Sequence, residues 1–381
     1  MFTKSIILLL GAVLIAGAQT KPPKRAKNVI LFLADAGGVA TLNGASLLGY
    51  NAPQKLHVQS WPALALSDTS PTGRWVTDSA AGMTAIVTGQ KTWNGVISQG
   101  PDTRRKEKDG TPLKTILEYA EERGLSTGVL SNVNIADATP AACYAHANDR
   151  ALFASIFLQI FTPRFGDGVD VVFGPGRKPV FDSVTAAGKD LDAIAKENGR
   201  PIYDTIEAVP EEDDRALAVI AGNIDLNAAA KKAIRKLSRN KKGFFLMIES
   251  DAHTDDPELG LSRLVSFDKL IAEISELVDL KETLLLFTAD HSFDFRIRSG
   301  GPNEPLLKGV AEWRQAKAAG NKEPVRLPFV HVDNGHTAEE VVVLAKGPGS
   351  ELVRGFLPNT RLFEIMLSAY GWNKAASRPT D

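Results

Sequence analysis

The segment at residues 76–85, VTDSAAGMTA, places an acid directly before a serine and then continues in small residues. A serine at the start of a helix lies among free backbone N–H groups, whose partial positive charge favours a bound anion. The small side chains leave room for a phosphate-sized group to approach the backbone. The segment therefore predicts Ser79 as a nucleophile beside an oxyanion site. Asp78 or Ser79 could also be a simple helix cap, and the rest of the chain has to decide between these roles.

Carboxylates and imidazoles that could bind metal ions stand next to several short apolar runs. The chain has one cysteine, Cys143, so a metal has to be held by oxygen and imidazole. So much negative charge in one place requires cations, and two zinc ions and one magnesium ion would satisfy it. Each residue alone is weak evidence, because an acid after a strand is often a helix cap. The candidate metal residues of this kind are Asp35, Glu249, Asp251, His253, Asp255, Asp290, His291 and His336.

The apolar runs have the length and composition of strands that are buried on both faces. They cover residues 28–34, 126–130, 170–173, 243–248, 283–288 and 341–345. Helical patterns lie between or after them, at 113–122, 259–278 and 360–370. This alternation predicts a three-layer α/β/α sandwich around a mostly parallel, doubly wound sheet. Sites in such sheets form beyond the carboxyl ends of the strands, where most of the candidate residues stand.

The composition allows one large domain or two smaller ones and gives no general attraction to polyanions. Of the 381 residues 44% are hydrophobic, and the formal net charge is −1, which argues against nucleic-acid binding. Residues 1–18 combine Lys4, an apolar run and small residues at 16–18, which predicts a cleaved signal peptide and a periplasmic or secreted protein. A membrane anchor is the alternative, but the run is short for a span, and no later segment is long and apolar enough. Residues 19–27 are then a basic leader, and 28–381 are the domain, with polar insertions expected near 183–235 and 296–328.

Taken in order, these segments resemble the alkaline phosphatase family from residue 28 to about residue 371. Residues 76–85 are similar to the family's nucleophile signature, with Ser79 in the serine position. TADH at 288–291 and GHTAE at 335–339 resemble its two later metal segments. DATPAA at 137–142, followed by HANDR at 146–150, resembles the segment that holds a magnesium-binding threonine and a phosphate-binding arginine. On this resemblance Thr139 and Arg150 are those two residues, and Asp35 is the family's bridging aspartate.

The resemblance implies a metal-dependent phosphate monoesterase. Ser79 would attack phosphorus in line and form a phosphoserine, which water then hydrolyses. Arg150 would bind two phosphate oxygens as a fork, positioned by Asp78. The substrates would be small phosphate monoesters. Alkaline phosphatases are often homodimers, so a homodimer is a further expectation, although no segment of the sequence marks an interface.

The resemblance also implies ligand sets for two zinc ions and one magnesium ion. The first zinc ion would be held by Asp35, Asp290 and His291, next to Ser79. The magnesium ion would be held by Asp35, Thr139 and Glu249. The second zinc ion would be held by His336 together with an acid and an imidazole from residues 251–255.

The chain departs from the family pattern after Glu249. The family places an aspartate five residues after this glutamate and a histidine four residues later. Here the corresponding positions hold Thr254 and Glu258. Asp251 and His253 are the expected replacements, with Asp255 in reserve. The ligand set of the second metal, and its identity, therefore stay open at the level of the sequence.

Three functions have to be compared. A phosphate monoesterase is favoured because the Arg150 guanidinium suits the oxygens of a monoester dianion. A phosphodiesterase of the same superfamily would require an apolar pocket at the position of Arg150. A sulfatase would require a modified Cys or Ser in a different motif. A secreted phosphate- or metal-binding protein is the non-enzyme alternative. Pure binding needs no nucleophile, so Ser79 beside Asp290 and His291 argues against it.

Overall fold

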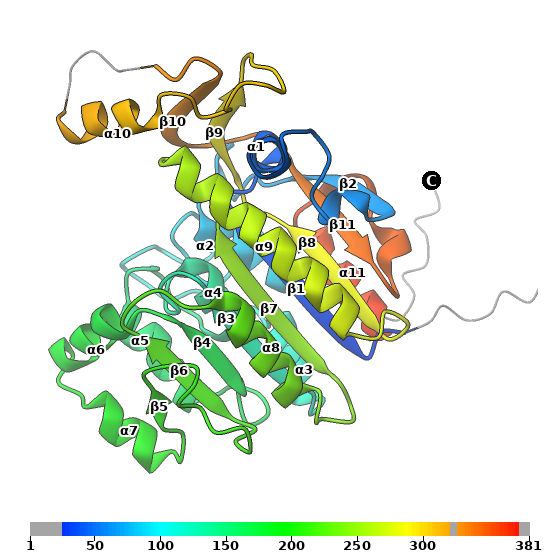
Figure 1. The fold of residues 1–381 in the computed structure, drawn as a ribbon. Coiled ribbons are helices and arrows are strands. Elements are labelled where there is room, and N and C mark those ends of the chain that lie inside the picture. Colours follow the sequence, from blue (N-terminus) through cyan, green and yellow to red (C-terminus); the bar gives the residue numbers. More distant parts are fainter. Residues whose placement is uncertain (1–24, 321–325, 373–381) are drawn as a thin grey trace, which may run out of the picture.

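The protein is described from a computed structural model that covers residues 25–320 and 326–372. The expected signal peptide and most of the basic leader lie outside these residues. Ten strands form one sheet in the order β12-β2-β11-β8-β1-β7-β3-β4-β6-β5 (Figure 1). The strands are β1 (Asn28–Asp35), β2 (Ala63–Asp68), β3 (Ser126–Ser131), β4 (Val171–Pro175), β5 (Ile202–Tyr203), β6 (Ala216–Ile220), β7 (Phe244–Asp251), β8 (Thr283–Thr288), β11 (Val341–Lys346) and β12 (Arg354–Pro358).

The sheet is mostly parallel, as the alternation of strands and helices predicts. Strand β11 is the exception, because it runs antiparallel to both β2 and β8. Helices α1, α8 and α9 pack on one face, and α2, α3, α4, α5, α6, α7 and α11 pack on the other. The helices are α1 (Val39–Tyr50), α2 (Ser79–Thr88), α3 (Ile116–Glu122), α4 (Ala138–Tyr144), α5 (Phe153–Leu158), α6 (Arg177–Ala186), α7 (Leu191–Glu197), α8 (Leu226–Leu237), α9 (Pro257–Leu277), α10 (Val310–Ala318) and α11 (Arg361–Tyr370).

Strand β1 is covered by helices on both faces, which explains why its sequence is apolar without alternation. Val29, Leu31 and Leu33 point into the core on the α2 face, whereas Ile30, Phe32 and Ala34 point into the core on the α9 face. Successive side chains of a strand alternate between faces, so a strand covered on both sides has to be apolar throughout. The prediction of a sheet with helices on both faces is therefore confirmed.

The two polar ranges of the sequence have different structures. Residues 183–235 contain β5 and β6, which extend the main sheet beyond β4, and α8, which covers it. Residues 296–328 contain α10 and connect two strands that lie outside the main sheet. These strands, β9 (Ser292–Ile297) and β10 (Val330–Thr337), form a small antiparallel sheet of their own. Among the described residues, no helix combines the length and the apolar character needed to span a bilayer.

Candidate active site

The candidate residues meet at the carboxyl ends of three neighbouring strands. Asp35 is the last residue of β1, and it is paired with Asp251 in the register of β1 and β7. Glu249 lies two residues earlier on β7, and Asp290 and His291 follow directly after β8. Because these three strands are parallel and adjacent, their ends lie at the same edge of the sheet.

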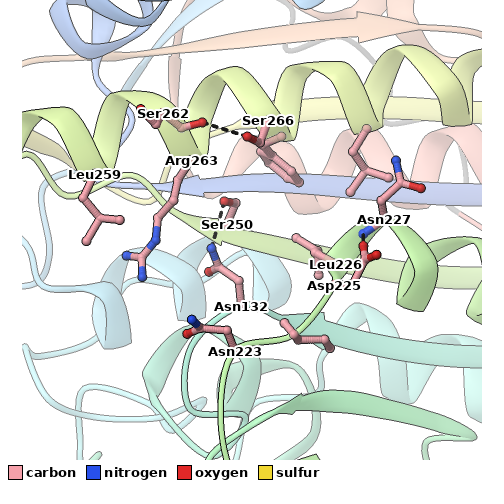
Figure 2. A pocket seen from close by; sticks show the side chains of 13 residues that line it. Asn132, Asn223, Asp225, Leu226, Asn227, Ser250, Leu259, Ser262, Arg263 and Ser266 are labelled. Carbon is pink, nitrogen blue, oxygen red and sulfur yellow. Dashed lines mark hydrogen bonds between the residues drawn. The ribbon is translucent and has the colours of Figure 1, made fainter. Parts of the chain in front are cut away.

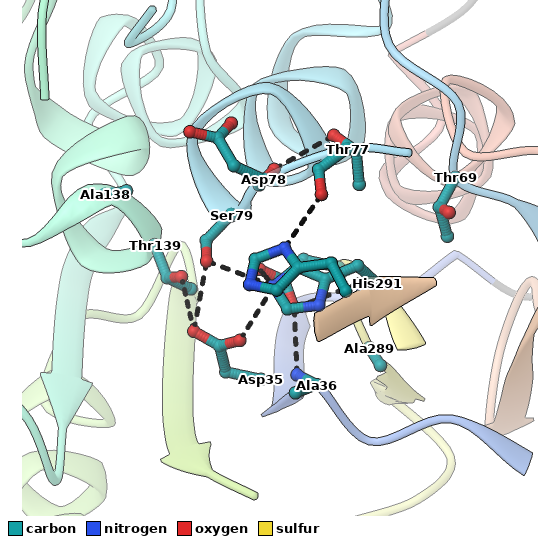
Figure 3. Close-up of polar contacts among 12 residues, drawn as sticks. Asp35, Ala36, Thr69, Thr77, Asp78, Ser79, Ala138, Thr139, Ala289 and His291 are labelled. Carbon is teal, nitrogen blue, oxygen red and sulfur yellow. Dashed lines mark hydrogen bonds and ion pairs between the residues drawn. The ribbon is translucent and has the colours of Figure 1, made fainter. Parts of the chain in front are cut away.

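Ser79 is the first residue of α2, and its side chain points towards Asp35 and His291 (Figure 3). Its Oγ is 3.4 Å from Asp35 Oδ2 and 3.2 Å from His291 Nε2, and only 3% of the residue is exposed. Helix α2 can approach this closely because residue 82 is glycine. A Cβ there would stand 2.6 Å from the carbonyl oxygen of Asp290. The glycine in the run of small residues therefore serves the packing of α2 against the segment after β8.

Asp78 combines the two roles that the sequence offered as alternatives. Its Oδ1 accepts the backbone N–H of Ala81 at 3.1 Å, so it caps α2. Its Oδ2 accepts from Arg150 Nη1 at 3.3 Å. The other end of the Arg150 guanidinium donates to Asp137 Oδ1 at 2.9 Å, and Asp137 caps α4. Arg150 is thus held between two carboxylates at the starts of two helices, and the role of Asp137 carries no sequence signal of its own.

Three buried carboxylates in this group have an oxygen without a hydrogen-bond partner among the described residues. These atoms are Asp35 Oδ1, Glu249 Oε1 and Asp290 Oδ2. His291 Nε2 lies 3.2 Å from the first and 3.6 Å from the third without forming a hydrogen bond. A buried carboxylate oxygen left unpaired is costly, and a bound cation is one of the few groups that can satisfy it. Ligand atoms of Asp35, Asp290 and His291 lie within 4.8 Å of one another, and so do ligand atoms of His253, His291 and His336. Oxygen with imidazole suits zinc, so the residues fit the metal that the family implies.

The pKa values at the site show an excess of negative charge. Burial, and then the charge of Asp35, raises the pKa of Asp290 to about 6. The same two causes raise the pKa of Glu249 well above its ordinary value. Burial opposes ionisation of Asp35, but the close His291 ring and the charges of His253 and Arg150 outweigh it, so the pKa of Asp35 is lowered. The raised pKa values of Asp290 and Glu249 have the same cause, a buried carboxylate close to another negative charge, and a bound cation would reverse this effect.

Two imidazoles are oriented by carbonyl groups. His336 Nδ1 donates to the carbonyl oxygen of Thr77 at 2.9 Å, and His291 Nδ1 donates to that of Ser292 at 3.1 Å. A carbonyl can only accept, so Nδ1 carries the proton in both rings and Nε2 is left for other partners. The two rings stack with their centroids 3.8 Å apart. His336 belongs to β10, so the small antiparallel sheet contributes to the site.

The expected magnesium residues lie around Asp35. Thr139, on α4, donates to Asp35 Oδ2 at 3.4 Å. Glu249 is 1% exposed, and its Oε2 accepts from Ser131 Oγ at 2.5 Å. Ser131 ends β3 and is a contact that the sequence pattern does not reveal. Hydroxyl and carboxylate oxygens are the ligands that magnesium prefers.

The segment after β7 departs from the family in structure as well as in sequence. Thr254 is buried, and its hydroxyl has no hydrogen-bond partner in the described part of the chain. Glu258 forms an ion pair with Arg314 at 2.5 Å. Asp255 is exposed and is not in either of the two ligand groups that include His291. His253 is in one of them, whereas both oxygens of Asp251 already accept hydrogen bonds from protein groups.

Comparison with known proteins agrees with this geometry. The sequence matches the model of a family described as alkaline phosphatase over residues 26–214 and 222–327. It is 28% identical to the streptomycin-6-phosphate phosphatase of Streptomyces griseus, covering 96% of this chain and 95% of that protein. It is 25% identical to the tissue-nonspecific alkaline phosphatase of Rattus norvegicus, covering 93% and 87%.

Solved structures lead to the same family. The alkaline phosphatase from the Antarctic bacterium TAB5 is 26% identical and superimposes with a TM-score of 0.74, over 93% of this chain and 100% of that one. A variant of the TAB5 enzyme, with the same identity and TM-score, was solved with magnesium bound. The nucleophile segment, the carboxylates at the strand ends and these likenesses agree. The chain therefore belongs to the alkaline phosphatase family of phosphate monoester hydrolases.

Proposed function

We propose that this protein hydrolyses phosphate monoesters through a phosphoserine on Ser79. The observation that supports this most directly is the position of Ser79 Oγ. It lies 3.2–3.4 Å from His291 and Asp35, in a buried group of carboxylates with unpaired oxygens. A serine in a purely structural role would not need so many groups that can bind cations around it.

The chain's own residues have distinct tasks in this reaction. A bond forms between Ser79 Oγ and phosphorus while the bond to the leaving-group oxygen breaks, and water later cleaves the new ester. Asp35 Oδ2 accepts from the serine hydroxyl and orients it. Arg150 binds two non-bridging oxygens of the phosphoryl group, and Asp78 and Asp137 hold its guanidinium in place for this.

We propose that two zinc ions and one magnesium ion complete the site. Asp35, Asp290 and His291 would hold one zinc ion, and Asp35, Thr139 and Glu249 would hold magnesium. His253 and His336 would hold the second zinc ion, and the contacts of Asp251 support a different role, described below. When bound, these ions would supply the positive charge that favours the serine alkoxide, the leaving oxygen and the transferred phosphoryl group.

The test is hydrolysis of p-nitrophenyl phosphate at alkaline pH. We expect turnover that is lost on chelation and restored by zinc plus magnesium. Ser79→Ala should abolish turnover, whereas Ser155→Ala, a change of an exposed serine on α5, should retain it. Protein quenched in acid during turnover should carry phosphate on Ser79. Full activity of Ser79→Ala, or no turnover by the metal-loaded parent, would show the proposed mechanism to be wrong.

We also infer that residues 1–18 are removed and that the mature protein is periplasmic or secreted. This inference is supported only by the sequence pattern of a short charged start, an apolar run and small residues. Sequencing the N-terminus of the protein recovered from the periplasm or the medium tests it. A protein that keeps residues 1–18 would contradict cleavage.

A further inference from the structure

We propose that Asp251 is a positioning residue that orients His253, and that Arg263 holds Asp251 in this position. This inference rests on the proposed metal site and refines it. At the level of the sequence, Asp251 is an expected metal ligand. Its contacts instead show that it hydrogen-bonds to His253, which is the proposed ligand.

Each oxygen of the Asp251 carboxylate already accepts from protein donors. Oδ1 accepts from the Nδ1 of His253 at 2.7 Å and from the backbone N–H of the same residue at 3.0 Å. Oδ2 accepts from Arg263 Nη1 at 2.5 Å. The backbone N–H of Asp251 donates to Asn132 Oδ1 at 2.8 Å. The backbone N–H and both carboxylate oxygens of Asp251 are therefore engaged by protein groups.

These contacts decide which nitrogen of His253 is available. A carboxylate only accepts, so Nδ1 carries a proton, and Nε2 is the nitrogen with a free lone pair in the neutral ring. The ring lies 5.4 Å from the ring of His291 and 5.6 Å from that of His336, measured between centroids. A histidine that binds a metal commonly donates its other N–H to a carboxylate, which sets the tautomer and the ring orientation. Asp251 supplies that carboxylate here.

The positive charge of Arg263 explains how the carboxylate of Asp251 is tolerated close to the other carboxylates of the site. Arg263 reaches from α9 towards the end of β7 and lines a pocket of about 400 Å³ together with Asn132 and Ser250 (Figure 2). Its guanidinium offsets the charge of Asp251, so that Oδ1 can face His253 while Asp35 is also near. Asn132 also donates to Ser250 Oγ at 3.1 Å, which ties the end of β3 to the end of β7.

The test compares two substitutions of Asp251 by measuring zinc affinity, without substrate, in competition with a chromophoric chelator. Asparagine keeps an acceptor for His253 Nδ1 but turns an amide NH2, which cannot accept, towards Arg263, so Asp251→Asn should lose about threefold in zinc affinity, clearly less than Asp251→Ala. Asp251→Ala removes the acceptor and should weaken binding at one site by about 10- to 100-fold. If Asp251 were itself a ligand, the neutral amide would be a poor substitute for the carboxylate, and both variants would lose affinity to a similar degree.

A double-mutant comparison separates positioning from ligation. In a His253→Ala background, neither Asp251→Ala nor Arg263→Leu should cause a further loss of affinity, because both act through His253. A further tenfold loss from Asp251→Ala in that background would overturn the inference. Asp255→Ala, which changes an exposed acid nearby, is the matched control and should bind zinc as the parent does.

The outcomes also distinguish this inference from the proposed function. A parent protein that binds no zinc would overturn the proposed metal site and this inference with it. A parent that binds zinc but forms no phosphoserine would contradict the mechanism. The zinc affinities of the Asp251 variants would still test the role of Asp251. Circular dichroism of Asp251→Ala should match the parent, and if that variant does not fold, Asp251→Asn still decides. A loss of zinc affinity by the folded Asp251→Asn variant of about 10-fold or more, as large as that expected of Asp251→Ala, overturns the inference.

Discussion

Replacing Glu121 by glutamine should reduce the loss of stability that this protein undergoes as the pH rises from 6.5 to 8. Glu121 lies near the end of α3, 4% exposed. Its Oε1 accepts from Thr127 Oγ1 at 2.5 Å, and its Oε2 accepts from the backbone N–H of Gly168 at 3.1 Å. Burial, and then the charges of Asp170 and Asp167, raises its pKa from 4.5 to about 8.

The sign follows from proton counts. Between pH 4.5 and 8 the folded protein keeps the proton of Glu121, whereas the unfolded chain has lost it, so rising pH favours unfolding. The contribution is fully present below pH 4.5 and is lost as the pH passes through 8. The shift corresponds to about 5 kcal/mol in total, of which about 1.5–2 kcal/mol falls between pH 6.5 and 8. Asp170, whose pKa burial raises to about 6, acts in the same direction but mostly below that window.

Urea unfolding at half-unit steps of pH, with a chelator present to remove any effect of metal release, measures this contribution. Glutamine resembles the protonated acid, because its carbonyl can accept from Gly168 and its amide can donate to Thr127. Glu121→Gln should therefore be more stable than the parent at pH 8 and show a shallower decline. Glu122→Gln, a change of the exposed neighbour that pairs with Lys114, should keep the parent's decline. An unchanged decline in Glu121→Gln would refute the reasoning.

Three further predictions concern the site. Gly82→Ala would bring a Cβ to 2.6 Å from the carbonyl oxygen of Asp290, and the required shift of about 0.8 Å should lower kcat by about 100-fold. Gly222→Ala, which meets nothing within 4 Å, should keep full activity, and equal rates for the two variants would contradict the packing argument. Arg150→Ala should raise KM for a monoester by 10-fold or more and spare a diester, and an equal effect on both would count against its role. Chelation should lower the unfolding temperature, with recovery on addition of zinc and magnesium, because an ion satisfies the unpaired oxygen of Asp35; an unchanged unfolding temperature would argue against a bound ion.

The parts of the fold that could be predicted are those with strong local patterns. Strands β1, β7 and β8 are apolar on both faces, and the acids that follow them stand where parallel strands end. Strand β12 is largely exposed, and it pairs with β2, almost three hundred residues earlier in the chain, so no local pattern marks it. Strands β9 and β10 contain polar residues and pair across a long connection.

The sequence indicates which residue types could form the candidate site, but it does not indicate the directions of their hydrogen bonds. Asp251, His253 and Asp255 are two residues apart and look alike as ligand candidates. Only the fold shows that Asp251 faces Arg263, on a helix that begins six residues later, while Asp255 faces outward. Such choices depend on the direction in which the chain leaves β7, and spacing along the sequence does not encode that direction.

The place of His336 on a separate small sheet has a kinetic consequence. An ion bound by both His253, just after β7, and His336 would join the end of the main sheet to strand β10, which pairs only with β9 among the described residues. Small peripheral sheets of this kind open locally far more often than a central strand such as β1. Release of such an ion would then be governed by the local unfolding of β9 and β10, so the residence time of the metal would report how often this part of the molecule detaches.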